Sequence, residues 1–129
     1  MSWKNTALWV LQIGLGIYFV FVGIIHFVVP DGLPGPMEWM YELSDTMHAI
    51  VGVVEILGGL GLILPSVTRI RPELTVYAAL GLITVMVGAM VWHATRSEPT
   101  SIAQNVLIAV LLGIIVYGRT RVAPITAKS

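Results

Sequence analysis

The stretch Val51-Gly-Val-Val-Glu-Ile-Leu-Gly-Gly-Leu-Gly-Leu-Ile-Leu64 decides the fold class, because it is apolar except for one acidic residue, Glu55. It belongs to a run from about residue 46 to 64 that can cross roughly 30 Å of hydrocarbon as a helix. An ionised group at that depth is costly, so such groups usually face a partner, a cavity or a proton path. The stretch therefore predicts a membrane-spanning helix with Glu55 directed at the protein interior.

The composition supports the same class for the whole chain. Of 129 residues, 57% are hydrophobic and 11% are charged, and the mean hydropathy is +0.89. Soluble domains carry about 25% charged residues, so the chain is predicted to be an integral membrane protein in contact with the lipid bilayer. The net charge is zero and there is no basic patch, which argues against nucleic-acid binding. The absence of cysteine excludes disulfides and thiolate nucleophiles within this chain.

Four apolar segments predict an all-α, transmembrane four-helix bundle that forms a single membrane domain over residues 1–129. Proline marks three of the segment ends: Pro30 and Pro65 are expected to stop the first and second spans, and Pro72 to begin the third. Ser101 followed by Gln104 resembles a capping box at the start of the fourth. The predicted spans are about 8–29, 46–64, 72–92 and 102–118.

The basic residues are distributed unequally between the two sides of such a bundle. Only Arg96 falls on one side, whereas six fall on the other: Lys4, Arg69, Arg71, Arg119, Arg121 and Lys128. The positive-inside rule then places both termini in the cytoplasm. We expect a multi-pass protein of the cell inner (plasma) membrane, with a disordered tail after Arg121.

The loop between the first two spans is acidic and lies on the outer side of this arrangement. Its segment 36–43 allows two interpretations: a short helix on the outer membrane surface, or a solvated loop anchored by Trp39. In the first interpretation, the apolar face of the helix would consist of Met37, Trp39, Met40 and Leu43.

Three spans carry a stripe of glycine and polar residues at spacings of three, four or seven. Small residues at these spacings let membrane helices approach closely, so packing is the simplest explanation of the glycines. The same faces also carry the polar groups, which makes a shared polar interior plausible. The stripes are Gln12, Gly16, Gly23 and His26 in span one; His48, Gly52, Glu55 and Gly59 in span two; and Tyr77, Gly81, Thr84 and Gly88 in span three.

The candidate ligand-binding residues are Glu55, His48, His26, Tyr18 and Thr84. Tyr18 and Thr84 reach a depth similar to that of Glu55, so either hydroxyl could form a hydrogen bond with its carboxyl group. We expect Glu55 to be protonated or paired with a histidine. Two roles remain open: a structural one, as a neutral hydrogen-bond donor between helices, and a proton-handling or ligand-binding one. No catalytic residue is identified.

All three histidines fall on the outer side of the predicted bundle. A metal site would require two or three of them to converge with suitable geometry. His93 points away from the stripe predicted for span three, and no closely spaced His-x-x-x-His or Glu-x-x-His pair is present. No metal site is predicted.

Three stretches together cover most of the chain: Gly23-Ile-Ile-His-Phe-Val-Val-Pro30, the segment from Glu55 to Pro65, and the proline-led third span that ends in His93. In this order they resemble the DoxX-like family. The resemblance implies a small four-helix integral membrane protein. It also implies possible links to quinone-coupled sulfur oxidation or to membrane redox complexes, although a eukaryotic relative assists receptor assembly.

Three functional hypotheses follow. The first is a quinone-associated accessory subunit of a membrane redox system, with quinone as a possible cofactor. Glu55 would exchange the proton that accompanies quinone reduction, and His26 or His48 would hold a carbonyl oxygen. The second is a non-catalytic assembly subunit, scaffold or chaperone in a larger membrane complex or homo-oligomer. The third is a small-solute or proton permease. Whether the protein is an enzyme stays open.

Overall fold

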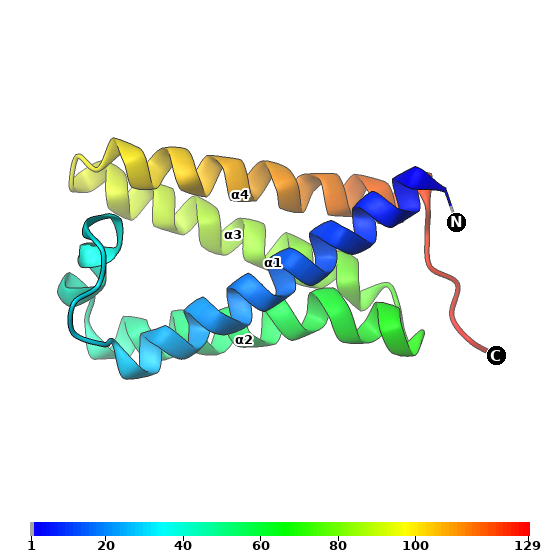
Figure 1. The fold of residues 1–129 in the computed structure, drawn as a ribbon, viewed down its shortest axis with the longest axis horizontal. Helices are drawn as coiled ribbons and strands as arrows, with labels where there is room; N and C mark the ends of the chain where they lie inside the picture. Colours follow the sequence, from blue (N-terminus) through cyan, green and yellow to red (C-terminus); the bar gives the residue numbers. More distant parts are fainter. Residues whose placement is uncertain (1) are drawn as a thin grey trace.

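The computed structural model describes residues 2–129 and contains four long helices (Figure 1). Each helix is apolar and long enough to cross a membrane, and no strand occurs in the described part of the chain. The predicted all-helical fold class is thus confirmed. The helices are α1 (Trp3–Val28), α2 (Asp45–Thr68), α3 (Leu74–Thr95) and α4 (Pro99–Tyr117), with a 3-10 helix η1 (Gly35–Glu42) and a terminal π-helical turn η2 (Gly118–Val122).

Two predicted helix ends are wrong. Helix α2 continues through Pro65 to Thr68, because a proline near the end of a helix removes only one backbone hydrogen bond. The residue after it, Ser66, is held by a buried hydrogen bond from Gln12 on α1. Helix α4 begins with Pro99 in its first turn, a position where the missing N–H costs nothing. The proposed capping box at Ser101 therefore lies inside the helix.

Helices α1 and α2 pack through glycine, as predicted for the stripes of the first two spans. A Cβ atom added to Gly59 would lie 2.6 Å from the carbonyl oxygen of Gly16, and one added to Gly52 would lie 3.0 Å from that of Gly23. Such distances leave no room for a side chain. The polar members of both stripes, among them His26 and Glu55, are buried together with these glycines.

The stripe predicted for the third span is on the wrong face. Tyr77, Gly81, Thr84 and Gly88 are all exposed, and a Cβ atom added to either glycine would meet nothing within 4 Å. The buried face of α3 consists of Thr75, Ala79, Leu82, Met86 and His93. The two faces are offset by two residues, which is about 200° around a helix.

An apolar layer fills the middle of the bundle. Its fully buried members come from all four helices and pack against one another in a single cluster. They include Phe19 from α1, Leu62 from α2, Leu82 from α3, and Leu112 and Ile115 from α4. Polar side chains are therefore concentrated toward the two ends of the bundle.

Each end of the bundle is covered by a different segment (Figure 1). Helix η1 folds across the end where α1 finishes and α2 begins, whereas both chain termini lie at the opposite end. The tail after η2 was expected to be disordered, but it is ordered against Arg69. The side chain of Arg69 donates to the carbonyl oxygen of Thr126 (2.8 Å), and the backbone N–H of Lys128 donates to the carbonyl oxygen of Arg69 (3.1 Å).

Candidate functional site

Beneath η1, the structure brings together three of the five candidate residues: His26, His48 and Glu55. All three side chains are buried. The Nδ1 atoms of the two histidines are 2.8 Å apart, and His48 Nε2 is 2.8 Å from the carbonyl oxygen of Met40 in η1. His26 Nε2 faces Glu55 Oε2 at 3.8 Å. These groups form a chain from the interior of α2 to the cover at the end of the bundle.

The chain has one consistent proton arrangement when both imidazoles are neutral. A carbonyl oxygen only accepts hydrogen bonds, so His48 Nε2 carries a proton and donates it to Met40. His48 Nδ1 is then the acceptor, and His26 Nδ1 must be the donor. His26 Nε2 is left with a free lone pair that faces the Glu55 carboxyl group across 3.8 Å.

A second arrangement contains the same number of protons. If Glu55 releases its proton to His26 Nε2 through an oxygen atom that bridges their 3.8 Å separation, then His26 can pass its Nδ1 proton to His48 Nδ1. The carboxylate then faces a neutral His26, and the positive charge lies on His48 nearest the cover. The three side chains can therefore move a proton equivalent from Glu55 to His48 while each ring nitrogen stays in place.

Glu55 has a hydrogen-bonding capacity that the described chain does not use. Its Oε2 atom is buried and has no hydrogen-bond partner among residues 2–129. The 3.8 Å separation from His26 Nε2 exceeds hydrogen-bond length, although one further oxygen atom could lie about 2.8 Å from both atoms. Buried polar groups without partners are rare in proteins, so this pair marks the place where a ligand oxygen or a water molecule would be held.

The other two candidate residues do not join this chain. The Thr84 hydroxyl is exposed and donates to the carbonyl oxygen of Leu80 in its own helix (3.1 Å), so the expected hydrogen bond to Glu55 is wrong. Tyr18 is half-buried, and its ring packs edge-on against Phe19 with centroids 5.2 Å apart. Its expected hydrogen bond to Glu55 does not occur in the part of the chain that the structure describes.

Helix η1 covers the site with an aromatic contact that the sequence did not reveal. The ring of Trp39 lies 6.1 Å from that of His26 and 5.1 Å from that of His93, measured between centroids. Met40, the next residue, is fully buried. The segment is helical, as in the first interpretation, and the four residues predicted to share its apolar face are its least exposed members.

Ion pairs connect the cover, helix η1, to the turn between α3 and α4. Arg96 donates to Glu42 of η1 (2.9 Å) and to Glu98 (2.8 Å). Glu98 also lies 3.1 Å from His93 Nδ1. The hydrogen bond with His93 lowers the pKa of Glu98, and the Arg96 guanidinium lowers it further. His93 on α3 thus contacts both the cover, through Trp39, and the ion pairs of this turn, through Glu98.

A second buried polar cluster lies at the opposite end of the bundle. Gln12 Nε2 donates to Ser66 Oγ (3.0 Å) and to the carbonyl oxygen of Leu62 (2.8 Å). The hydroxyl groups of Ser66 and Thr75 are 2.7 Å apart, and Arg119 Nε donates to Gln12 Oε1. Of these, only Gln12 was placed in the interior from the sequence. Ser66 continues the span-two stripe, seven residues beyond Gly59, but the predicted end of that span at Pro65 left it outside the helix.

Neither cluster has the composition of a metal centre. Among residues 2–129, no group of three or more His, Asp or Glu side chains is arranged to hold a metal ion. The His26–His48–Glu55 chain is instead suited to accepting a proton in the bundle interior and releasing it at the η1 end. It provides one buried carboxyl group with a free oxygen and two imidazoles whose hydrogen bonds run in one direction.

Comparisons with known proteins give one match. A family model described as the DoxX-like family matches residues 10–115, a range that includes the whole His26–His48–Glu55 chain and the apolar layer. No curated protein and no solved structure matches the chain significantly.

Proposed function

This chain belongs to the DoxX-like family, and we propose that it is a quinone-associated accessory subunit of a membrane redox system that exchanges protons through Glu55. The observation that carries the proposal is the Glu55–His26–His48 chain, which ends at the carbonyl oxygen of Met40. Quinols release protons when they are oxidised, so a quinone partner needs a nearby proton acceptor with a route to water.

The contacts within the chain define which atoms are available to such a ligand. Both ring nitrogens of His48 are engaged, one with His26 and one with Met40. His48 is therefore a poor candidate for holding a quinone carbonyl group, and its role is proton transfer. His26 Nε2 and Glu55 Oε2 are the free pair, and they would hold the quinone oxygen between them.

Tryptophan fluorescence provides a direct test of this proposal. Trp39 lies against His26, so a ligand held at His26 and Glu55 should quench its emission. Trp3 and Trp9, at the far end of α1, are first replaced by Phe to reduce the background. A short-chain ubiquinone analogue is then titrated into the full chain in detergent. Glu55→Gln should weaken binding about tenfold, the effect of losing one charge-assisted or strong hydrogen bond.

The matched control is Glu73→Gln, which alters an exposed carboxyl group at the other end of the bundle. It should leave quinone affinity unchanged. Extraction of the purified protein into organic solvent should also release quinone in a stoichiometry that falls in Glu55→Gln. The proposal is wrong if wild-type protein neither copurifies with quinone nor shows saturable quenching, or if both glutamine variants bind equally well.

One observation favours the alternative role as a non-catalytic assembly subunit. Gly81 and Gly88 lie on the exposed face of α3 with open space above them, and Thr84 lies between them. Small residues on a lipid-facing surface permit close approach of another helix, which could belong to a partner or to a second copy. Crosslinking from Thr84→Cys in native membranes would test this, and the absence of any crosslinked product would argue against it.

The permease hypothesis receives less support. Phe19, Leu62 and Leu112 are fully buried between the two polar clusters, so the described bundle has no continuous polar route along its axis. A solute or proton that crosses the membrane would have to pass through this packed layer or between copies of the chain.

A further inference from the structure

At the end of the bundle that carries both termini, Arg119 is a buried cation without a carboxylate partner. The residue is 6% exposed. Its Nη1 donates to Asn5 Oδ1 (2.7 Å) and to the carbonyl oxygen of Ala123 (2.8 Å), and its Nε donates to Gln12. All three acceptors are neutral, and Arg119 has no ion pair within residues 2–129.

The guanidinium group also has donor capacity to spare. Its Nη2 atom is buried and has no hydrogen-bond partner in the described chain. A buried charge is normally paired, because removing it from water without a counter-charge is costly. Arginine remains protonated under all ordinary conditions. Both the unbalanced charge and the free N–H group therefore call for an oxyanion, and the planar fork of arginine suits a phosphate.

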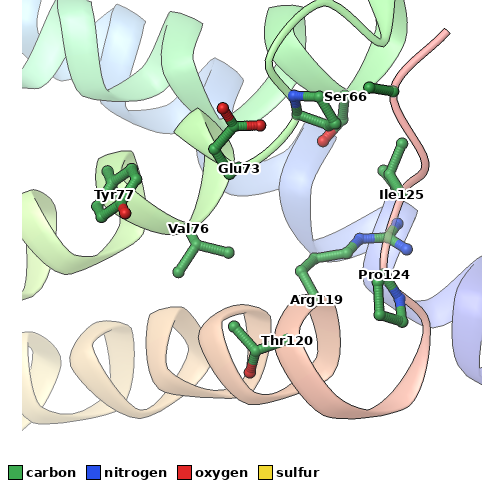
Figure 2. A pocket seen from close by; sticks show the side chains of 10 residues that line it. Ser66, Glu73, Val76, Tyr77, Arg119, Thr120, Pro124 and Ile125 are labelled. Atoms are coloured by element: carbon green, nitrogen blue, oxygen red, sulfur yellow. The ribbon is translucent and has the colours of Figure 1, made fainter. Parts of the chain in front are cut away.

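A pocket of about 370 Å³ lies beside this residue. Figure 2 shows Arg119 and Thr120 on one side of it, and the guanidinium group turned toward the tail at Pro124 and Ile125. The opposite side includes the carboxyl group of Glu73. The pocket thus borders the buried cation, two helices and the terminal tail.

The acidic group in this pocket is already compensated. Glu73 Oε1 accepts a hydrogen bond from Arg71 Nε at 3.1 Å, and both side chains are largely exposed. Within residues 2–129, Glu73 is the only acidic side chain at this end of the helices, against six basic ones: Lys4, Arg69, Arg71, Arg119, Arg121 and Lys128. The local field therefore favours an anion.

We propose that Arg119 and the adjoining pocket bind the phosphate group of an anionic phospholipid. Clustered basic residues next to membrane-spanning helices attract such lipids. The pocket is also lined by Val76 and Tyr77, and Tyr77 is 64% exposed on the outer face of α3. An acyl chain can continue from the pocket along this apolar face, past Leu80. Free phosphate would use the same cation but not this face.

Access to the guanidinium group requires the tail to shift. The Ala123 carbonyl group is bound to Nη1, and the tail beyond it forms two hydrogen bonds with Arg69. Those bonds are exposed, so water can replace them at little net cost. The lipid phosphate takes the place of the Ala123 carbonyl group and also engages Nη2.

The test measures lipid retention by native mass spectrometry on the full chain, delipidated in a neutral detergent and then titrated with phosphatidylglycerol or phosphatidylcholine. Wild-type protein should retain phosphatidylglycerol about tenfold better than phosphatidylcholine, because the choline ammonium group already balances the phosphate of phosphatidylcholine, whereas the phosphate of phosphatidylglycerol has only Arg119 as its counter-charge. Arg119→Gln and Val76→Trp should each remove that preference. Val76→Trp fills the pocket while leaving the contacts of Arg119 intact, so it tests the site even if Arg119→Gln misfolds.

The matched control is Arg121→Gln, which removes an exposed positive charge two residues away and should change retention less than twofold. Equal retention of the two lipids by wild-type protein would overturn the proposal, as would an equal loss in Arg121→Gln and Arg119→Gln, which would indicate diffuse surface charge. Unchanged retention in Val76→Trp would also overturn it. Inorganic phosphate that displaces phosphatidylglycerol at millimolar concentration would assign the site to free phosphate, against the lipid.

Discussion

Gly59→Ala is expected to destabilise the pairing of α1 and α2 by about 2 kcal/mol. The new Cβ atom would lie 2.6 Å from the carbonyl oxygen of Gly16 and 2.9 Å from the backbone nitrogen of Val20. Ordinary contact begins at 3.4 Å, so α1 must move by about 0.8 Å (3.4 − 2.6). No side-chain rotation relieves contacts with backbone atoms. Overpacking of this kind costs up to about 3 kcal/mol, and alanine recovers about 1 kcal/mol through its helix propensity.

The measurement is unfolding in mixed micelles of increasing SDS content, followed by circular dichroism. Gly81→Ala is the control, because it makes the same substitution in an apolar helix where the added Cβ atom meets nothing within 4 Å. That variant should be unchanged or up to about 1 kcal/mol more stable. Equal unfolding midpoints for Gly59→Ala and Gly81→Ala would refute the close backbone contact between α1 and α2.

Two further predictions concern the polar groups at either end. Gln12→Leu removes the donor to the Leu62 carbonyl group and should lower the free energy of unfolding by about 2–3 kcal/mol, because its buried partners lose a hydrogen bond. The control Gln104→Leu changes an exposed residue and should stay within about 0.5 kcal/mol of wild type. Similar losses of stability for the two variants in the same SDS assay would contradict this. The hydrogen bond with His93 lowers the pKa of Glu98 below its ordinary value of 4.5. The stability that the ionised Glu98 contributes is therefore complete above pH 4.5. It is lost as the pH falls through the lower pKa of the folded state. Tryptophan emission should report this acid transition, and an identical titration curve for Glu98→Gln would rule the assignment out.

The four-helix architecture was predictable because length and hydropathy alone separate spans from connections. The inward faces of α1 and α2 were also predictable, because glycine and titratable residues coincide there. The residue types on these two faces are informative without knowledge of the tertiary structure. Gly16 and Gly59 permit the close contact between the two helices, and an exposure of Glu55 to lipid would be energetically costly. The same reasoning failed for α3, where glycine occurs on the exposed face and Gly81 has no neighbour.

A spacing of three and four residues runs through the buried faces, but it could not have corrected that error, because Tyr77, Gly81, Thr84 and Gly88 have the same spacing. The buried residues of α2 are His48, Gly52, Glu55, Gly59, Leu62 and Ser66, and those of α4 and its terminal turn include Ile108, Leu112, Ile115 and Arg119. This period is typical of left-handed helical bundles. Applied to α3 from Thr75, it leads to His93. Starting from Thr75 and not from Tyr77 depends on how α3 packs against its neighbours, which the spacing does not specify.

The contacts of η1 could not have been predicted from local pattern. Trp39 packs against His26 on α1 and His93 on α3, and Arg96 reaches Glu42 across 54 positions of sequence. Such pairs depend on how the helices are arranged in space. The aromatic and acidic residues of η1 could form chemically similar contacts with many other residues of the chain. The direction of hydrogen bonding through His48 likewise depends on a backbone carbonyl group, that of Met40, which no residue type specifies.

The separation of the two polar clusters limits what Glu55 can do with a proton. Ser66 lies eleven residues beyond Glu55 on α2, which is about 16 Å along the helix, and fully buried Phe19 and Leu62 lie in the layer between them. A proton taken up at Glu55 should therefore leave through His48, at the η1 end. Liposomes containing the protein should dissipate an imposed pH gradient no faster than empty liposomes, with gramicidin as the positive control. A proton leak that Glu55→Gln abolishes would show that the carboxyl group communicates with both sides of the membrane, and the one-sided exchange inferred from the apolar layer would be wrong.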